Sequence, residues 1–130
     1  MTMHDLEQLA HINEEIKKDR RRLAQLQAAS TSTSSAPTGM PHARSLSDKP
    51  AMAAAIADCE RTIADSIDAR TLEYAKITSF VQNIQDSRLR RIFKLRYLDC
   101  CTWWKVAREI GGGNTDSSVR MAVDRYLKNH

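Results

Sequence analysis

The sequence predicts an all-α protein, in which an N-terminal helical pair (coiled coil or hairpin) is followed by a C-terminal three-helix helix-turn-helix unit. Apolar residues recur at alternating steps of three and four over two long stretches, which is the spacing of one helix face. Three of the four glycines form one cluster, which separates two short amphipathic patterns near the C-terminus. Only seven of the 130 residues are aromatic, and few runs favour strands.

Length and composition narrow the class of protein. A chain of 130 residues forms one domain or two small ones. No apolar run reaches the roughly 20 residues that span a bilayer, and the N-terminus lacks an apolar signal-peptide core. The three cysteines and four histidines lack the spacing of a zinc or redox site, so we expect free thiols and no metal or cofactor. A soluble intracellular protein without a membrane partner is therefore expected.

Residues 1–28 are expected to form a coiled-coil helix, because their apolar positions follow steps of three and four. These positions are Leu9, Ile12, Ile16, Leu23 and Leu26. The five basic and five acidic residues favour a solvated helix face over a nucleic-acid patch at Lys17 to Arg22.

Residues 29–50 are expected to form a flexible linker. They are rich in Ser, Thr and Pro and contain almost no large apolar side chains. Such a segment cannot bury enough surface to offset the entropy lost on ordering. Its length allows the helices on either side to fold back antiparallel.

Residues 51–85 carry the most regular seam and are expected to form a second coiled-coil helix. The seam comprises Ile56, Glu60, Ile63, Ile67, Arg70, Tyr74, Ile77, Val81 and Ile84. One helix cannot bury this stripe alone, so it needs the first helix, a second subunit, or both. We expect a helical hairpin that forms a homodimer or higher oligomer through residues 1–85. Glu60 and Arg70 within the seam would fix its register.

Residues 86–130 are expected to form a helix-turn-helix domain of three helices. The first spans Asp86 to Leu98, with Asp86 or Ser87 as its N-cap. The inward residues of the other two are Trp103, Val106, Ala107 and Ile110, and then Val119, Val123 and Leu127.

The ends of the last two helices carry capping residues. Thr102 is placed to cap the first of them, and Gly111 falls where a left-handed C-cap is needed. Asn114, Thr115 and Asp116 supply an N-cap and an acidic first turn for the last helix.

Positive charge is concentrated in this last domain. Residues 88–130 carry ten Lys/Arg and four Asp/Glu, whereas residues 51–87 have a net charge of −3. A basic region beside an acidic one indicates a polyanionic partner, here double-stranded DNA, and the second helix of such a motif enters the major groove. Hydroxyls and arginines on that helix can reach phosphates and base edges. The candidate DNA-binding residues are Lys105, Ser117, Ser118, Arg120, Met121, Arg125 and Lys128.

Two segments, RIFKLRYLDCCTWWKVAREIG and SSVRMAVDRYLK, resemble region 4 of sigma-70-type factors. That module also has an LRY-type helix, a Thr- or Ser-capped helix ending in Gly, and a recognition helix that contains Val-Arg. With its N-terminal helical pair and its Gly39-Met40-Pro41 element, the whole chain is similar to small Gram-positive bacteriophage and prophage proteins of the ArpU type. This resemblance implies a regulator of late transcription in the cytoplasm of a bacterial host cell.

Residues and resemblance together favour a sequence-specific, DNA-binding transcriptional regulator that is phage-encoded and acts on late genes. The alternative is an interaction module that binds RNA polymerase or another host protein and modulates transcription without binding DNA. The outer face of residues 116–128 bears on this choice: it is mostly polar, which favours DNA, but it includes Met121. An enzyme is disfavoured and no catalytic residue is proposed, because the chain lacks a phosphate-binding loop, a metal cluster and a Ser/His/Asp arrangement.

Overall fold

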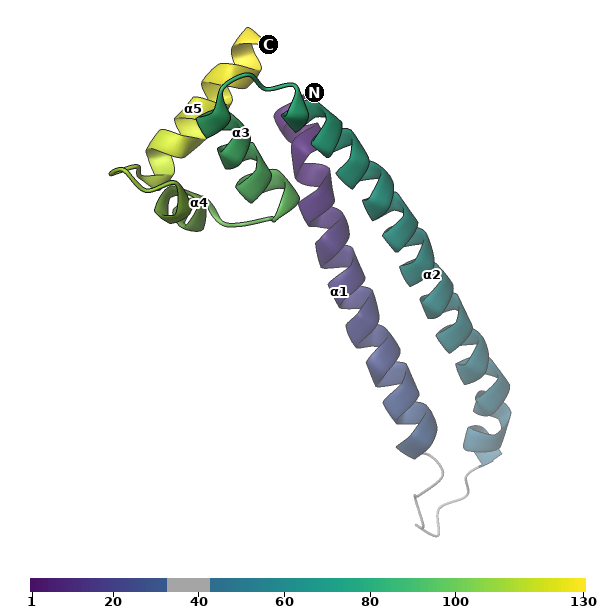
Figure 1. The fold of residues 1–130 in the computed structure, drawn as a ribbon. Coiled ribbons are helices and arrows are strands. Elements are labelled where there is room, and N and C mark those ends of the chain that lie inside the picture. The colour runs from purple at the N-terminus through teal and green to yellow at the C-terminus, as the bar shows by residue number, and fades with distance from the viewer. Residues whose placement is uncertain (33–42) are drawn as a thin grey trace. The chain divides into compact units, whose positions relative to one another are not determined.

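The computed structural model describes residues 1–32 and 43–130, with side chains described for 1–31 and 49–130, and no strand occurs in these residues. The elements in order are α1 (Met3–Ser32), α2 (Ala43–Gln82), α3 (Ser87–Phe93), the π-helical turn η2 (Lys94–Leu98), α4 (Trp103–Ile110) and α5 (Asp116–Asn129) (Figure 1). The predicted all-α fold class is confirmed, and the described residues are compatible with a helical pair followed by a C-terminal helix bundle. Across the described ranges, no helix is both long and apolar enough to cross a membrane.

The chain divides into two compact units. One comprises residues 1–13 and 69–130, and the other comprises residues 14–68. The boundary expected at residue 86 therefore lies inside the first unit, which also contains the beginning of α1 and the end of α2.

Within the unit of residues 14–68, α1 and α2 lie side by side (Figure 1) and meet along a narrow seam. Ile16 on α1 and Cys59 and Ile63 on α2 are buried there. The Cys59 thiol donates a hydrogen bond to the carbonyl oxygen of Asp19 across the seam, at 3.3 Å. Glu60 is exposed, so its predicted place in the seam is wrong. Cys59 occupies that place because it is apolar enough to be buried without a charged partner.

Both ends of the expected linker, residues 29–50, are helical in the structure. α1 continues to Ser32, and α2 begins at Ala43 with Pro50 inside it. The Thr31 hydroxyl donates to the carbonyl oxygens of Gln27 and Ala28, which allows this polar side chain to lie in a helix. The expectation of flexibility over residues 33–42 lies outside the described residues.

The unit of residues 1–13 and 69–130 has one core, to which every helix contributes. Its fully buried members include Leu6 and Leu9 of α1, Ile77 and Val81 of α2, Phe93 of α3, Val106 of α4, and Val119 and Val123 of α5. The Phe93 ring lies 5.6 Å from the rings of both Tyr97 and Tyr126, and 5.8 Å from that of Phe80. Helices α3, α4 and α5 thus share one core with the beginning of α1 and the end of α2.

The second seam is only partly correct in this unit. Ile77, Val81 and Ile84 are buried as expected, but Tyr74 is 48% exposed. Leu72, outside the expected seam, is 65% exposed. Apolar residues spaced by three and four along α2 can belong to either of two neighbouring faces of the helix. Packing against α1 decides which of these faces is buried.

Candidate nucleic-acid interface

Helix α4 begins and ends as its sequence indicates. The Thr102 hydroxyl accepts a hydrogen bond from the Lys105 backbone N–H at 3.2 Å, which confirms Thr102 as the N-cap. At the other end, Gly111 has φ of +70° and ψ of −155°, a region that essentially only glycine adopts. Its backbone differs in ψ from the expected left-handed cap, but the need for glycine is the same.

The turn after α4 is held by one asparagine. The Asn114 amide donates to the Gly111 carbonyl oxygen at 2.6 Å, and its side-chain oxygen accepts from the Arg88 guanidinium at 2.7 Å. Arg88 belongs to α3, so this pair ties the start of α3 to the turn that leads into α5.

Helix α5 begins with a reciprocal capping box. The Thr115 hydroxyl accepts from the Ser118 backbone N–H at 3.1 Å, and the Ser118 hydroxyl accepts from the Thr115 backbone N–H at 2.9 Å. Ser118 was expected to point outward, but it is half-buried and its hydroxyl is engaged in this cap. Sequence periodicity could not show this, because a serine at the third helical position can serve either the solvent face or the cap.

The remaining candidate residues lie on exposed surface. On α5 these are Ser117, Arg120, Met121, Arg125 and Lys128, and on α4 it is Lys105. Val119 and Val123 are fully buried beneath them, and Leu127 packs against the core. The helix therefore presents one polar face with two arginines, while its other face holds it to α3 and α4.

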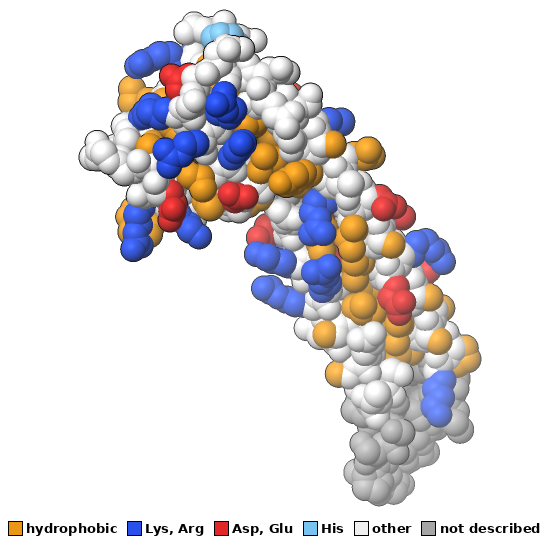
Figure 2. Space-filling model, viewed as in Figure 1, with side chains coloured by type: hydrophobic (Ala, Val, Ile, Leu, Met, Phe, Trp, Pro, Cys, Tyr) orange, Lys and Arg blue, Asp and Glu red, His pale blue; other side chains and the backbone are white. Residues whose placement is uncertain are grey.

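No carboxylate among the described side chains forms an ion pair with the cations of residues 88–130. The ion pairs found among the described residues join neighbours along α1 or α2, and none involves residues 88–130. Three arginines have structural hydrogen bonds instead: Arg88 to Asn114, Arg90 to the Ile84 carbonyl, and Arg96 to the Cys101 carbonyl. The other seven cations of this segment are all exposed: Arg91, Lys94, Lys105, Arg108, Arg120, Arg125 and Lys128. Figure 2 shows Lys and Arg side chains gathered over α3, α4 and α5.

Two exposed residues on α4, Trp104 and Arg108, were missed by the sequence reasoning. Trp104 is 64% exposed, and the Arg108 guanidinium lies 5.4 Å from its ring centroid. Trp103 is half-buried and packs against Tyr97, with ring centroids 6.2 Å apart. The Trp103-Trp104 doublet was the available signal, because adjacent helix residues point about 100° apart and both rings cannot face the core.

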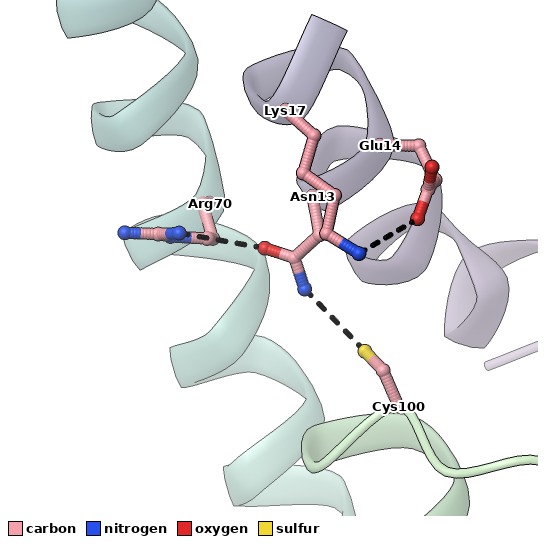
Figure 3. Close-up of polar contacts among 5 residues, drawn as sticks. All are labelled: Asn13, Glu14, Lys17, Arg70 and Cys100. Atoms are coloured by element: carbon pink, nitrogen blue, oxygen red, sulfur yellow. Dashed lines mark hydrogen bonds and ion pairs between the residues drawn. The ribbon is translucent and has the colours of Figure 1, made fainter. Parts of the chain in front are cut away.

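Asn13 connects three segments of the first unit (Figure 3). Its amide donates to the Cys100 sulfur at 3.4 Å, and its side-chain oxygen accepts from Arg70 at 3.5 Å. Cys100, two residues after the end of η2, has a positive φ of 55°, which is uncommon outside glycine and asparagine. All three cysteines are free, and no cluster able to hold a metal ion was found among the described residues. This contact positions the segment that leads into α4.

Tyr97 links η2 to the start of α1. Its hydroxyl donates to the Met3 sulfur at 2.8 Å, and the side chain is 3% exposed. Burial raises the pKa of Tyr97 to about 12, although the positive charge of Arg96 acts in the opposite direction. Tyr97 is therefore neutral at physiological pH and is part of the buried core.

No protein-family model, curated protein or solved structure matches this chain.

Proposed function

We propose that the protein is a sequence-specific, DNA-binding transcriptional regulator that reads the major groove with α5. The observation that carries this proposal is the outer face of α5, where Ser117, Arg120, Arg125 and Lys128 are exposed and none of the cations is paired within the described chain. If this face of α5 were part of a core or of an intramolecular salt-bridge network, its cations would be buried or paired with carboxylates. Helix α5 has 14 residues, and an α-helix with its side chains is about 10–12 Å in diameter, which fits the major groove of B-DNA, about 12 Å wide.

Each exposed residue has a role in this arrangement. Arg120 and Arg125 are the base-edge or phosphate contacts, because a guanidinium can bind guanine through two hydrogen bonds. Ser117, at the start of α5, together with Lys105 and Lys128, contacts the backbone and sets the register. Ser118 contributes through the capping box that orders the start of the helix. Arg88 and Asn114 act as positioning residues by holding the turn against α3.

The resemblance to ArpU-type regulators extends the proposal to phage late genes in the cytoplasm of a bacterial host. We also propose that the protein acts as a homodimer or higher oligomer through residues 1–85, so that two copies of α5 read two half-sites. Tyr74, a position of the expected seam that is 48% exposed on α2, is the aromatic side chain that a partner copy would cover. Sedimentation at micromolar concentration tests this, and a single species of 14.7 kDa would remove the dimer from the proposal.

A second candidate is a module that binds RNA polymerase or another host protein without binding DNA. The exposure of two large apolar side chains on the same unit favours it: Met121 is 58% exposed on α5, and Trp104 is 64% exposed on α4. Loss of partner binding in Met121→Ala, with no DNA binding by the intact protein, would establish this candidate in place of the first.

Selection of bound sequences from random duplex DNA, followed by binding measurements on the selected site, tests the main proposal. The double variant Arg120→Ala/Arg125→Ala should lose affinity, with about 1–3 kcal/mol for each base-edge contact. Loss of an arginine that contacts a phosphate should instead make the negative slope of log K against log salt shallower by about 0.9. The matched control is Arg20→Ala/Arg21→Ala, which removes the same charge from exposed positions on α1. Unchanged affinity in the α5 variant would contradict groove reading by this helix.

A further inference from the structure

The exposed ring of Trp104 has no role in the fold. Its neighbour Trp103 supplies the aromatic contact to the core, where it packs against Tyr97 and under the Arg96 guanidinium, 4.6 Å from its ring centroid. Trp104 is turned away from that cluster and remains 64% exposed. A large aromatic side chain that projects from a basic surface is a feature of binding sites rather than of cores.

Arg108 lies one helical turn after Trp104 and covers one face of its ring. Its guanidinium is 5.4 Å from the ring centroid, within the range of a cation–π contact. Within the described part of the chain, neither the guanidinium nor the indole N–H has a hydrogen-bond or ion-pair partner that would satisfy it. The two side chains thus present five guanidinium N–H donors and one indole N–H donor beside an apolar ring.

This pair lies beside the N-terminal end of α5, the helix that reads the groove in the proposed function. A groove of about 390 Å³ is lined by Trp104, Ala107 and Arg108 of α4, by Asn114 and Thr115 of the turn, and by Asp116 of α5. The Asp116 carboxylate already accepts from the Ser117 backbone N–H at 2.9 Å. Its negative charge repels a phosphate, so an anionic chain passes on the Trp104 and Arg108 side of the groove.

We propose that Trp104 and Arg108 bind the sugar–phosphate backbone of duplex DNA beside the groove that α5 reads. The indole ring packs on a deoxyribose, its N–H donates to a phosphate oxygen, and Arg108 pairs with a phosphate. Lys105, also exposed, is the adjacent cation on α4. A protein partner is less favoured here, because the ring is flanked by two cations and by polar groups of the turn. This inference rests on the proposed function, since it assumes that α5 meets duplex DNA.

The test uses the full chain and sonicated mixed-sequence duplex DNA, because backbone contacts do not depend on base sequence. Trp103→Phe leaves Trp104 as the one tryptophan, and its iodide quenching is measured with and without DNA, while the anisotropy of a labelled duplex reports binding. DNA should protect Trp104 from iodide. Trp104→Ala should weaken binding to all duplexes alike by about tenfold, since a hydrogen bond to a charged group and a packed ring are lost. Trp104→Phe, which keeps a ring but has no N–H, should weaken binding less.

Arg108→Gln should make the negative slope of log K against log salt shallower by about 0.9, the value for one phosphate contact. Arg21→Gln, at an exposed position on α1, is the matched control and should leave the slope unchanged. Circular dichroism should show full helicity in the Trp104 and Arg108 variants, because both side chains are exposed.

Three results would overturn the inference. If the duplex binds but Trp104 remains fully quenchable, the backbone contact is wrong and the proposed function stands. If no duplex binds at low salt, the proposed function fails together with the contact. If Trp104 becomes protected with rising protein concentration in the absence of DNA, it contacts a second copy of the chain instead.

Discussion

Individual arginines in this protein have different tasks, although the sequence presents them as one basic cluster. Arg88, Arg90 and Arg96 donate to Asn114, Ile84 and Cys101 and hold segments together. The exposed arginines and lysines of α4 and α5 have no such partner among the described residues. Removing a structural arginine should therefore reduce stability, whereas removing an exposed one should change binding and leave stability within about 0.5 kcal/mol.

The glycine that ends α4 should be sensitive to substitution for a reason that involves only the backbone. At Gly111 an added Cβ would meet no atom within 4 Å, but φ of +70° with ψ of −155° is closed to other residues. Gly111→Ala should lower the free energy of unfolding by about 1–3 kcal/mol. Urea denaturation measures this, with the exposed Glu109→Ala on the same helix as the control. Equal stability of the two variants would mean that the turn relaxes freely.

The buried hydroxyl of Tyr97 should make stability depend on pH in the alkaline range. Its pKa is raised to about 12 in the folded chain, against 10.0 for an unperturbed tyrosine, so the folded state holds this proton more tightly. The stability that Tyr97 adds by holding this proton is fully present below about pH 10 and is lost as the pH rises toward about 12. Each unit of difference between the folded and unfolded pKa corresponds to at most roughly 1.4 kcal/mol of unfolding free energy. Urea unfolding of wild type and Tyr97→Phe across this range separates the effect from lysine deprotonation. Parallel curves for the two proteins would contradict it.

Among the elements, α2 shows how a helix with an ambiguous stripe is oriented. Its buried positions in the two units are Cys59, Ile63, Ile77 and Val81, while Glu60 and Tyr74 of the expected seam face solvent. Successive residues of a helix point about 100° apart, so a seam displaced by one position lies on a different face. Packing against α1 therefore decides which apolar residues of α2 are buried.

This orientation gives a matched pair of variants on α2. Ile77→Ala should cost about 2–5 kcal/mol, because Ile77 is fully buried and its removal leaves a cavity. Tyr74→Ala should cost far less in the monomeric fold, since nearly half of that side chain is exposed. Thermal unfolding monitored by circular dichroism compares them. A larger loss at Tyr74 would indicate that it is covered in solution, as in the proposed oligomer.

At the scale of the whole molecule, the helix-turn-helix domain is built from both ends of the chain. Leu6 and Leu9, near the N-terminus, are buried in the same core as Val106 and Val123. The Tyr97 contact with Met3 and the Asn13 contact with Cys100 join the same segments. The domain expected for residues 86–130 therefore lacks part of its core when separated from residues 1–13 and 69–85.

Two experiments address this dependence. A fragment of residues 86–130 should show no cooperative unfolding, because it lacks the buried side chains of α1 and α2. In the full chain, Leu6→Ala should destabilise the unit by about 2–5 kcal/mol, as reported by tryptophan fluorescence from α4. Leu72→Ala deletes the same atoms at a position that is 65% exposed and serves as the control. A cooperative fragment with full helicity would show that the C-terminal helices are sufficient.

The sequence by itself determined the features that depend on residues within one or two helical turns. The all-α class, the N-cap Thr102, the need for glycine at 111, and the inward faces of α4 and α5 all follow from local spacing and side-chain chemistry. The structure selected Asp86 over Ser87 as the N-cap of α3, and Thr115 as that of α5. Hydrogen bonds in a cap close over three residues, and one helix face repeats every three or four. Such patterns are visible without knowledge of the rest of the chain.

Only the tertiary structure decided which distant segments share a core and which side chains remain free. Periodicity cannot show that Leu6 packs with α3 to α5, or that Cys59 replaces Glu60 in the seam. Nor can it separate Arg88, bound to Asn114, from Arg108, which remains exposed beside Trp104. The physical reason is that burial and hydrogen bonding between segments depend on how helices pack, and one stripe of apolar residues is compatible with several packings.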